Sequence, residues 1–442
     1  MQLNELKERV AAAGIIGAGG AGFPTAVKIA EGADTLLINA AECEPLLYTD
    51  FHLVRRHLDK ILAGAEAVMQ IAGIPNGYIA LKEHNLRALR MEHGQQLSQH
   101  IKVAQLPNSY PVGDEVILTY QVLRRIIRPG ALPLSAGVLI FNAETMYNVY
   151  NAIAENAPVT EKWVTIAGKV RNHVTLRVPV GMNVAELIQA TGNTVPDGCV
   201  VIDGGPAMGS IIDPEHSFVK KTTKSILILP EDIPAVASKL TPNRAINVHA
   251  SSNCCQCTMC TDLCPRALIG YPLHPHKIVR TSVAMVEEMP ELFTEAQLCS
   301  GCGVCEMTSC CQGISPARVY AQVKGILAKN KLRYQATAEP EANPERDYRI
   351  LPSERFKRRI GVADFDQVTE LTEDNVPEVK TLTMLLKQHA GAPAEAAVAQ
   401  GDTVTAGQII AQANGAISAN IHAPRSGVVQ SVTPDRIVIS VR

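Results

Sequence analysis

Ten of the twelve cysteines in the 442-residue chain lie between residues 254 and 311, in two closely spaced runs. The first run has the spacing C-x2-C-x2-C-x3-C-P and ends in Cys264-Pro265. In bacterial ferredoxins such a run gives three thiolates to one [4Fe–4S] cluster and its fourth cysteine to a second cluster. Proline after the fourth cysteine removes a backbone donor and turns the chain away. The segment is therefore predicted to hold two iron–sulfur clusters that transfer electrons.

The second run begins at Cys299 and has the spacing C-x2-C-x2-C-x4-C, one residue longer than usual before its last cysteine. Because the fourth ligands cross over, eight cysteines divide between two clusters. One cluster takes Cys254, Cys257, Cys260 and Cys310, and the other takes Cys264, Cys299, Cys302 and Cys305. Cys311 is an alternative to Cys310. Cys255 is not needed to satisfy the spacing and is predicted not to be a ligand.

Two other uses of clustered cysteines fit the sequence less well. Zinc sites usually pair two C-x2-C motifs across a long loop, whereas here the four cysteines of the first motif fall within eleven residues and the arrangement is repeated. A disulfide framework would spread its cysteines along a small secreted chain. Iron–sulfur clusters therefore remain the preferred interpretation.

A glycine-rich loop at residues 14–25 is the second candidate site. Three of its glycines match G-x-G-x-x-G, namely Gly17, Gly19 and Gly22. A dinucleotide-binding fold requires a strand directly before such a loop, but residues 3–13 are predicted to be helical and the apolar strand 35–39 comes afterwards. A standard Rossmann site is thus not expected. Small residues still let backbone amides approach a phosphate, and Lys28 follows one helical turn later; the alternative is a tight structural turn.

Four motifs occur in the order found in the NADH-oxidising subunit of respiratory complex I and in RnfC-type subunits. The loop 17–25 with Lys28 resembles their flavin-binding loop. Residues 39–45, Asn-Ala-Ala-Glu-Cys-Glu-Pro, resemble their acidic segment, and residues 142–145, Asn-Ala-Glu-Thr, resemble their Asn-Val-Glu-Thr. Residues 110–115, Tyr-Pro-Val-Gly-Asp-Glu, resemble Tyr-x-x-Gly-Glu-Glu with Asp in place of the first Glu. Four ordered motifs are far more specific than one loop.

This resemblance implies non-covalent FMN beside a site for NADH. The phosphate would be held by Gly17, Gly19, Gly20, Gly22 and Lys28. The flavin would be surrounded by Asn39, Glu42 and Asn142. The surroundings of the flavin or of NADH would include Glu44, Tyr110, Gly113, Asp114 and Glu115, and Phe23 would stack on the nicotinamide. The acids have an alternative role in a solvated loop, but Glu42 and Glu44 follow an apolar strand, where α/β proteins tend to place sites.

The motifs and their spacing predict a multidomain α/β and α+β protein. The predicted units are an α/β flavin-binding domain of the complex I type at 1–158, a β-grasp domain at 159–240, a helical two-cluster ferredoxin domain at 241–330, a connecting segment at 331–372 and an all-β barrel-sandwich domain at 373–442. The β-grasp domain resembles the soluble-ligand-binding domain of the same proteins. Its glycine-rich segment 204–209 forms either a turn or a ligand contact. The barrel-sandwich domain resembles biotinyl and lipoyl domains. Its hairpin 414–420 has no lysine, which predicts a docking or structural role.

The predicted domain order separates this chain from RnfC-type subunits, which begin with the barrel-sandwich domain. A C-terminal barrel-sandwich domain resembles the cobalamin reductases of the propanediol-utilisation microcompartment, the PduS type. The resemblance implies an NADH-dependent enzyme in which FMN and two [4Fe–4S] clusters pass electrons to cobalamin and support coenzyme B12 regeneration. A flavin is expected because NADH gives paired electrons and clusters take single ones. No catalytic nucleophile or base is predicted.

The implied partners are NADH, cobalamin, an adenosyltransferase and a microcompartment shell protein, and the implied location is the cytoplasm, within such a microcompartment. One alternative is an RnfC-like subunit that exchanges electrons between NADH and ferredoxin or a membrane complex. Another is a non-catalytic electron conduit docked to a shell. The net charge of -2 predicts no nucleic-acid partner. No apolar run is long enough to predict a membrane span, and residues 1–10 lack a signal-peptide pattern.

Overall fold

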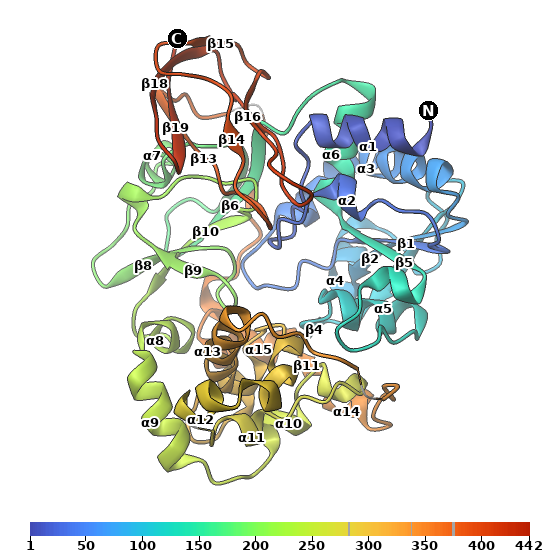
Figure 1. Cartoon of the computed structure of the whole chain (residues 1–442), viewed down its shortest axis with the longest axis vertical. Helices are drawn as coiled ribbons and strands as arrows, with labels where there is room; N and C mark the ends of the chain where they lie inside the picture. The colour runs from blue at the N-terminus through green and yellow to red at the C-terminus, as the bar shows by residue number, and fades with distance from the viewer. Residues whose placement is uncertain (282, 337, 374–375) are drawn as a thin grey trace.

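The N-terminal part of the chain is a parallel sheet covered by helices (Figure 1). The computed structural model describes residues 1–281, 283–336, 338–373 and 376–442. The strand order is β3-β2-β1-β5, and the bounds are β1 (Thr35–Asn39), β2 (Asn76–Lys82), β3 (Ile101–Leu106) and β5 (Val138–Asn142). Four of the five residues of β1 are buried, as expected for a parallel strand with both faces covered.

Side chains of β1 alternate between the two faces of this sheet. Leu36 and Ile38 pack with α1 (Leu3–Ala12), α3 (Thr49–Ala72) and α6 (Ala143–Ala154), whereas Leu37 packs with residues of α5 (Glu115–Leu123). The short α2 (Thr25–Lys28) follows the glycine loop, and α4 (Glu83–Leu89) follows β2. Parallel strands end at a common edge, where Asn39 and Asn142 are register partners. The predicted flavin motifs therefore start from one edge of the sheet.

A six-stranded mixed sheet follows, in the order β12-β7-β6-β10-β8-β9. Its bounds are β6 (Glu161–Gly168), β7 (Val174–Pro179), β8 (Cys199–Asp203), β9 (Ser210–Ile212), β10 (Ser225–Pro230) and β12 (Glu370–Thr372). The central strands β6 and β10 are parallel, and α7 (Val184–Ala190) contributes Leu187 and Ile188 to the same hydrophobic core as Val164 and Ile166. Strand β12 comes from a part of the chain 196 residues beyond its partner β7.

The segment 331–372, expected as a connection, packs into the body of the protein. Its β11 (Leu351–Pro352) pairs with β4 (Ser109–Tyr110), and its α15 (Ser353–Ile360) buries Phe356 and Ile360. These two residues are four apart and so lie on one face of the helix. The segment thus shares one core with Tyr110 of β4, with the mixed sheet and with the cysteine-rich region.

The cysteine-rich region is mainly helical and lies at the lower end of the molecule in Figure 1. Its helices are α8 (Pro234–Leu240), α9 (Asn243–Asn253), α10 (Met259–Asp262), α11 (Pro275–Ile278), α12 (Val283–Glu288) and α13 (Pro316–Lys329), with α14 (Arg346–Arg349) after them. Tyr320 and Val323 of α13 belong to one core with Val116 and Ile117 of α5. This shared core fixes the cysteine-rich region against the N-terminal sheet.

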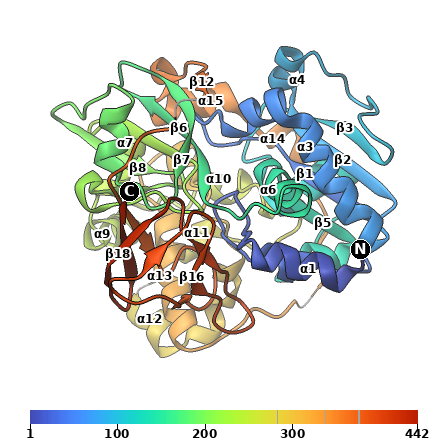
Figure 2. The same ribbon diagram turned by 90° about the horizontal axis from the view of Figure 1, so that it is seen from above.

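The C-terminal region is a pair of antiparallel sheets. One contains β13 (Thr381–Leu385), β19 (Arg436–Val441), β18 (Gly427–Val432) and β15 (Thr403–Val404), and the other β14 (Glu395–Ala396), β16 (Ile409–Gln412) and β17 (Ile421–His422). Leu382 and Ile439 share a core with Val164 of the mixed sheet. Seen from above, these sheets lie beside α1 (Figure 2), and the Asn420 side chain donates to Ala11 O.

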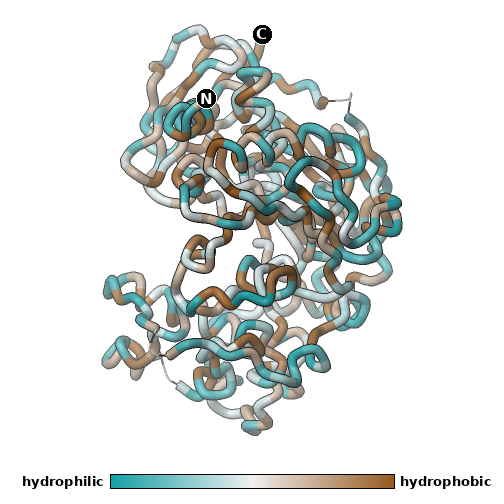
Figure 3. Tube along the Cα trace, turned by 90° about the vertical axis from the view of Figure 1, so that its right-hand side faces the viewer, coloured by the Kyte–Doolittle hydropathy of each residue, from teal (hydrophilic) through white to brown (hydrophobic). Residues whose placement is uncertain are grey.

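Hydropathy varies over short distances along the chain, with hydrophobic and hydrophilic stretches alternating throughout the trace (Figure 3). Within the part of the chain that the structure describes, no helix combines the length and apolar character that a bilayer crossing requires.

Candidate redox site

Two cavities in the cysteine-rich region divide the predicted ligands into two groups. Cavity I, which opens to solvent, spans about 350 Å³ and is lined by four of them, Cys254, Cys257, Cys260 and Cys310. Cavity II, also open to solvent, spans about 370 Å³ and is lined by the other four, Cys264, Cys299, Cys302 and Cys305. The structure thus brings together each set that the crossover rule assigns to one cluster.

The residues of cavity II suit an iron–sulfur cluster. Burial raises the pKa of the Cys264 thiol to about 11, so a thiolate there needs a positive partner such as iron. Tyr320 lines the cavity, is buried, and has a hydroxyl without a hydrogen-bond partner among the described residues. A sulfur atom of a bound cluster would accept a hydrogen bond from this hydroxyl. Lys324 donates to Cys299 O and places a cation beside the thiolates.

Cavity I has the same thiol chemistry and is closer to solvent. Burial raises the pKa of Cys260 to about 12. The backbone N–H of Ile314 donates to Cys310 Sγ at 3.3 Å, a kind of contact that tunes cluster thiolates. Cys257 is exposed, whereas Cys305 of cavity II is buried. Cys311 also lines cavity I, so the alternative to Cys310 stays open.

The long spacing before Cys310 corresponds to a π-helical turn at Cys305–Ser309. A π-helix closes hydrogen bonds from i to i+5 and accommodates one extra residue in a wider turn. This turn separates Cys305, which lines cavity II, from Cys310, which lines cavity I. The departure from the usual spacing therefore has a local structural counterpart.

The glycine loop lies near the carboxyl edge of the parallel sheet, with its tip exposed. The N–H groups of Gly19, Gly20 and Ala21 make no hydrogen bond to the described residues. A Cβ built on Gly20 would meet no atom within 4 Å, and one on Gly19 would lie 3.6 Å from the Asn142 side chain. Free amides on small residues form a concavity for anions. The loop therefore fits the phosphate of a flavin nucleotide.

Other residues of the loop fix its shape. The Gly17 N–H donates to Phe23 O at 2.8 Å, and Phe23 itself is half-buried. Gly22 has φ 64°, and a Cβ there would lie 2.9 Å from Thr222 Cγ2. This combination of left-handed backbone and close approach requires glycine.

Lys28 and Glu115 meet beside the loop. Lys28 Nζ lies 2.6 Å from Glu115 Oε1, and the two side chains are 25% and 46% exposed. Lys28 Nζ also lies 5.6 Å from the centre of the Phe141 ring. Phe141 directly precedes Asn142, and the Asn142 side chain lies against Gly19, so the ammonium group is on the side of the loop and is expected to contribute positive charge to phosphate binding.

We expect Lys28→Ala to raise the Kd for FMN about tenfold, because one charge-assisted contact to phosphate is worth ~1.5 kcal/mol. Cluster iron should not change, since Lys28 does not line either cavity. Flavin fluorescence quenching and iron assay measure the two quantities. Lys60→Ala is a matched control, because Lys60 pairs with Glu155 at 2.7 Å with similar exposure. Equal loss of FMN in both variants, or parallel loss of iron, contradicts the assignment.

The two strand-end asparagines form part of a polar network. Asn39 Nδ2 donates to Gly113 O at 2.9 Å, and Asn142 Nδ2 donates to Asp50 Oδ2 at 2.9 Å and to Asn39 O at 3.2 Å. A Cβ on Gly113 would lie 2.7 Å from Cys43 Sγ, so this position requires glycine. The predicted residues Asn39, Gly113 and Asn142 are therefore adjacent.

Glu42 lies in the segment after β1 and caps the N-terminus of α3. Its carboxylate accepts hydrogen bonds from the backbone N–H groups of Asp50 at 2.8 Å and Phe51 at 3.0 Å. Burial, followed by the nearby Asp50 carboxylate, raises the pKa of Glu42 to about 7, although Lys224 opposes the shift. The structure thus places Glu42 at a helix terminus.

The raised pKa of Glu42 predicts a pH-dependent stability term. The folded protein binds this proton more tightly than the unfolded chain, whose pKa is about 4.5. The contribution is complete below pH 4.5 and is lost as the pH rises through about 7, by up to ~3 kcal/mol. Glu42→Gln is neutral at every pH but accepts through one oxygen only, so it loses one of the two backbone N–H bonds. Its melting temperature should lie below that of the parent at pH 5 and rise relative to the parent by a few degrees between pH 5 and pH 8. Calorimetry at both pH values checks this; a constant difference contradicts it.

Glu44 and Tyr110 lie where three regions meet. The Tyr110 hydroxyl is 2.8 Å from both Glu44 Oε1 and Cys302 O, and Glu44 Oε2 accepts from the Ala207 N–H at 2.9 Å. A tyrosine hydroxyl has one proton. Both contacts are satisfied when Glu44 is protonated and donates to Tyr110 while Tyr110 donates to Cys302. Burial, which raises the pKa of Glu44, favours this form. Tyr110 also stacks on Phe356, with ring centroids 4.0 Å apart.

Asp114, at the start of α5, also connects the N-terminal region to cavity II. It caps α5 and forms a two-pronged ion pair with Arg266, at 3.1 Å to Nε and 2.7 Å to Nη2. Arg266 lines cavity II and donates to Leu298 O at 2.6 Å. Asp114 and Tyr110 therefore contact the cluster region directly, whereas Lys28, Glu115 and the asparagines remain near the glycine loop.

The sequence motifs did not identify several charged residues that the structure places at these sites. Arg266 carries a signal that could have been used, because it directly follows Cys264-Pro265. Glu144 belongs to the Asn-Ala-Glu-Thr motif, but its buried partner Lys162 has no motif. The pair Lys224–Asp50, at 2.5 Å, contacts the asparagine network through Asp50 and has no motif either.

Lys221 is a further residue without a motif. Its buried ammonium donates to Gly14 O and Asn420 O, both at 2.7 Å. The N–H of Ala390 also donates to Gly22 O at 3.0 Å. Lys221, just before β10, and Asn420 and Ala390 of the C-terminal region therefore hold both ends of the glycine loop.

Three family models match successive parts of the chain. The Nuo51 FMN-binding domain matches residues 10–151, the 4Fe-4S dicluster domain matches 253–315, and the RnfC barrel sandwich hybrid domain matches 364–440. These matches confirm the predicted flavin-binding, two-cluster and barrel-sandwich units, and their order places the barrel-sandwich unit last.

Curated relatives show the same family. The cobalamin reductase PduS of Citrobacter freundii is 39% identical over 98% of this chain and 96% of its own length. The PduS protein of Salmonella typhimurium is 38% identical over 99% and 97%. One component of the Na(+)-translocating ferredoxin:NAD(+) oxidoreductase complex of Acetobacterium woodii is 30% identical over only 60% and 58%. The chain belongs to the PduS cobalamin reductase family of flavin and iron–sulfur oxidoreductases.

Proposed function

We propose that this chain is an NADH-dependent cobalamin reductase that reduces cob(III)alamin and cob(II)alamin and so supports regeneration of coenzyme B12. FMN would bind at the glycine loop and one [4Fe–4S] cluster in each cavity. The observation that carries the proposal is the similarity to PduS cobalamin reductases along nearly the whole chain. The two four-cysteine cavities and the free loop amides supply matching sites for the cofactors.

Each part of the site has a role in this proposal. Bound FMN supplies a centre that accepts an electron pair and releases single electrons, and the clusters carry single electrons. The loop amides and Lys28 hold the flavin phosphate, and Asn39 and Asn142 line the edge beside it. Glu115 and Phe23, both partly accessible at the loop, are the proposed contacts for NADH.

The protein gives the two cavities different surroundings. Tyr110 of β4 and Asp114 at the start of α5 contact Cys302 and Arg266 of cavity II. Cavity I has the exposed Cys257 on its wall. The fold therefore holds cavity II against the flavin-binding domain and presents cavity I to an external acceptor such as a corrin.

Further parts of the proposal concern organisation and partners. We assign strands β6 to β10 of the mixed sheet to a β-grasp domain within residues 159–240, and keep 1–158, 241–330, 331–372 and 373–442 as the limits of the other units. Strand β12 of this sheet comes from the segment 331–372. An adenosyltransferase and a shell protein are proposed partners, and a bacterial microcompartment in the cytoplasm is the proposed location. These assignments are supported by the similarity to PduS proteins.

The proposal is tested by anaerobic absorbance of the protein reconstituted with FMN, iron and sulfide. NADH and hydroxocobalamin are added, and the corrin bands should shift to those of reduced cobalamin at a rate proportional to protein concentration. A control without protein measures direct reduction.

Two other results separate the alternatives. If NADH bleaches the flavin and clusters but the corrin does not change, the acceptor is wrong and an RnfC-like exchange with ferredoxin is favoured. If NADH reduces neither the flavin nor the clusters, the chain is a conduit and not an NADH oxidase.

A further inference from the structure

The mouth of cavity I has more thiols than one cluster uses. Six cysteines line this cavity, whereas a [4Fe–4S] cluster takes four thiolates. With Cys254, Cys257, Cys260 and Cys310 as ligands, two remain, Cys255 and Cys311. Both are exposed to solvent.

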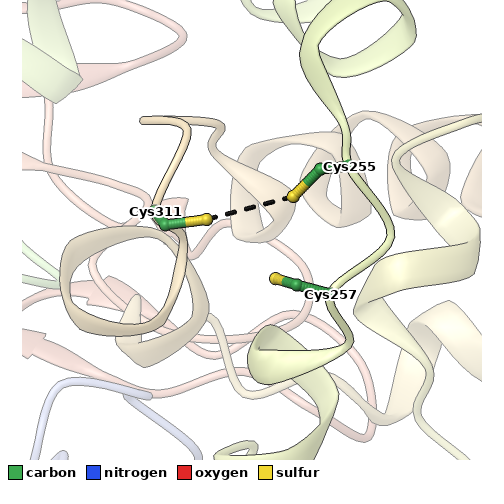
Figure 4. Close-up of side chains that lie close together, drawn as sticks. All are labelled: Cys255, Cys257 and Cys311. Carbon is green, nitrogen blue, oxygen red and sulfur yellow. Dashed lines mark hydrogen bonds between the residues drawn. The ribbon is translucent and has the colours of Figure 1, made fainter.

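These two remaining thiols face each other across the mouth. Their Sγ atoms are 4.0 Å apart, and both lie within 4.8 Å of Cys257 Sγ (Figure 4). Cys255 belongs to the first cysteine run and Cys311 to the end of the second, 56 residues later. Three free thiols at this spacing would suit a soft metal ion. Because Cys257 is a proposed cluster ligand, the loaded protein offers a pair of thiols rather than a three-thiol metal site.

We propose that Cys255 and Cys311 form a reversible disulfide across the mouth of cavity I while the eight cluster ligands stay in place. An S–S bond of about 2.05 Å requires the two exposed Sγ atoms, now 4.0 Å apart, to approach by about 2 Å. We expect rotation about the χ1 angles to bring them together.

The oxidant is a low-molecular-weight disulfide such as oxidised glutathione. The thiolate of one cysteine attacks it, forms a mixed disulfide and releases one glutathione thiolate. The second cysteine thiolate attacks the protein sulfur of that mixed disulfide and releases the second glutathione. The pair loses two electrons and two protons, and the glutathione disulfide is reduced to two thiols.

The bond would join the two walls of cavity I. The loop that carries Cys255 also supplies Cys254 and Cys257, and the residue before Cys311 is Cys310. A covalent link between these walls limits their separation, so the cluster in cavity I should be released more slowly. The pair is thus a modification site that protects the more exposed cluster under oxidising conditions.

The test uses the full chain with both clusters loaded, kept anaerobic and treated with oxidised glutathione. After acid quenching and blocking with N-ethylmaleimide, peptide mass spectrometry should detect a link between residues 255 and 311 with iron content unchanged. The linked protein should lose iron to a chelator several-fold more slowly than the untreated protein. Cys255→Ser and Cys311→Ser should each abolish the link and retain the iron, and Cys199→Ser, on β8, should behave like the parent.

Three results would overturn the proposal. The first is the absence of the link at glutathione disulfide concentrations that modify exposed thiols. The second is loss of about half the iron in Cys311→Ser, which would make Cys311 a cluster ligand and not a free thiol. The third is equal iron release from linked and untreated protein, which would remove the protective role.

Discussion

Replacing Cys257 by Ala is expected to remove about half of the protein's iron and to abolish NADH-dependent cobalamin reduction. The side chain lines cavity I with three other predicted ligands, and a cubane without one of its thiolates exposes an iron to solvent. Cavity II does not include this residue, so its cluster and the flavin should remain. Iron assay, electron paramagnetic resonance of the reduced protein and flavin absorbance distinguish these contributions.

The Cys257→Ala substitution is tested most strictly in a protein that also lacks the two neighbouring thiols. Cys255 Sγ and Cys311 Sγ lie within 4.8 Å of Cys257 Sγ and are close enough to replace it. The variant Cys255→Ser/Cys257→Ala/Cys311→Ser removes the thiols that could replace the lost ligand. It should lose all the iron of cavity I, which is half of the total. Cys255→Ser/Cys311→Ser is its control and should keep all the iron. Retention of full iron in the triple variant would contradict the ligand assignment for cavity I.

The cysteine sites were accessible from the sequence because cluster ligation is largely local. Three ligands of each cluster lie within seven residues, so spacing alone predicts their grouping. The apolar strand predicted at 35–39 coincides with β1 (Thr35–Asn39), since a parallel strand buried on both faces is a continuous apolar run. The flavin motifs were found through resemblance to a family, not through spacing.

Contacts between distant segments could not be read from local patterns. Arg266 and Asp114 are 152 residues apart, and Tyr110 and Cys302 are 192 apart. Neither pair has a periodicity that links its members. The packing of α5 against the cysteine-rich region brings Asp114 to Arg266, and the core around Phe356 of α15 brings Tyr110 to Cys302. The burial of part of residues 331–372 was not predicted for a different reason. The cluster of basic residues in α15 gives the segment a polar composition, which concealed the apolar pair Phe356 and Ile360.

Replacing Arg266 by Met should both destabilise the protein and slow electron transfer into the clusters. Removal of the guanidinium leaves Asp114, whose side chain is only 9% exposed, as an uncompensated buried charge, at a cost of about 3 kcal/mol. Arg266 also holds Leu298 O next to Cys299. The rate at which NADH bleaches the clusters should fall at least tenfold, whereas reduction of ferricyanide directly by the flavin should be unchanged. Stopped-flow absorbance measures both rates.

Two variants test whether this effect belongs to the buried pair. Arg128→Met removes an arginine whose ion pair with Glu339 is 60% and 69% exposed, and exposed pairs contribute less than about 1 kcal/mol. Asp114→Asn combined with Arg266→Met should recover stability, because Asn still caps α5 and leaves no buried charge. If cluster reduction slows equally in Arg128→Met, or if the double variant recovers both stability and cluster reduction in full, Arg266 has no specific role in holding cavity II against the flavin-binding domain.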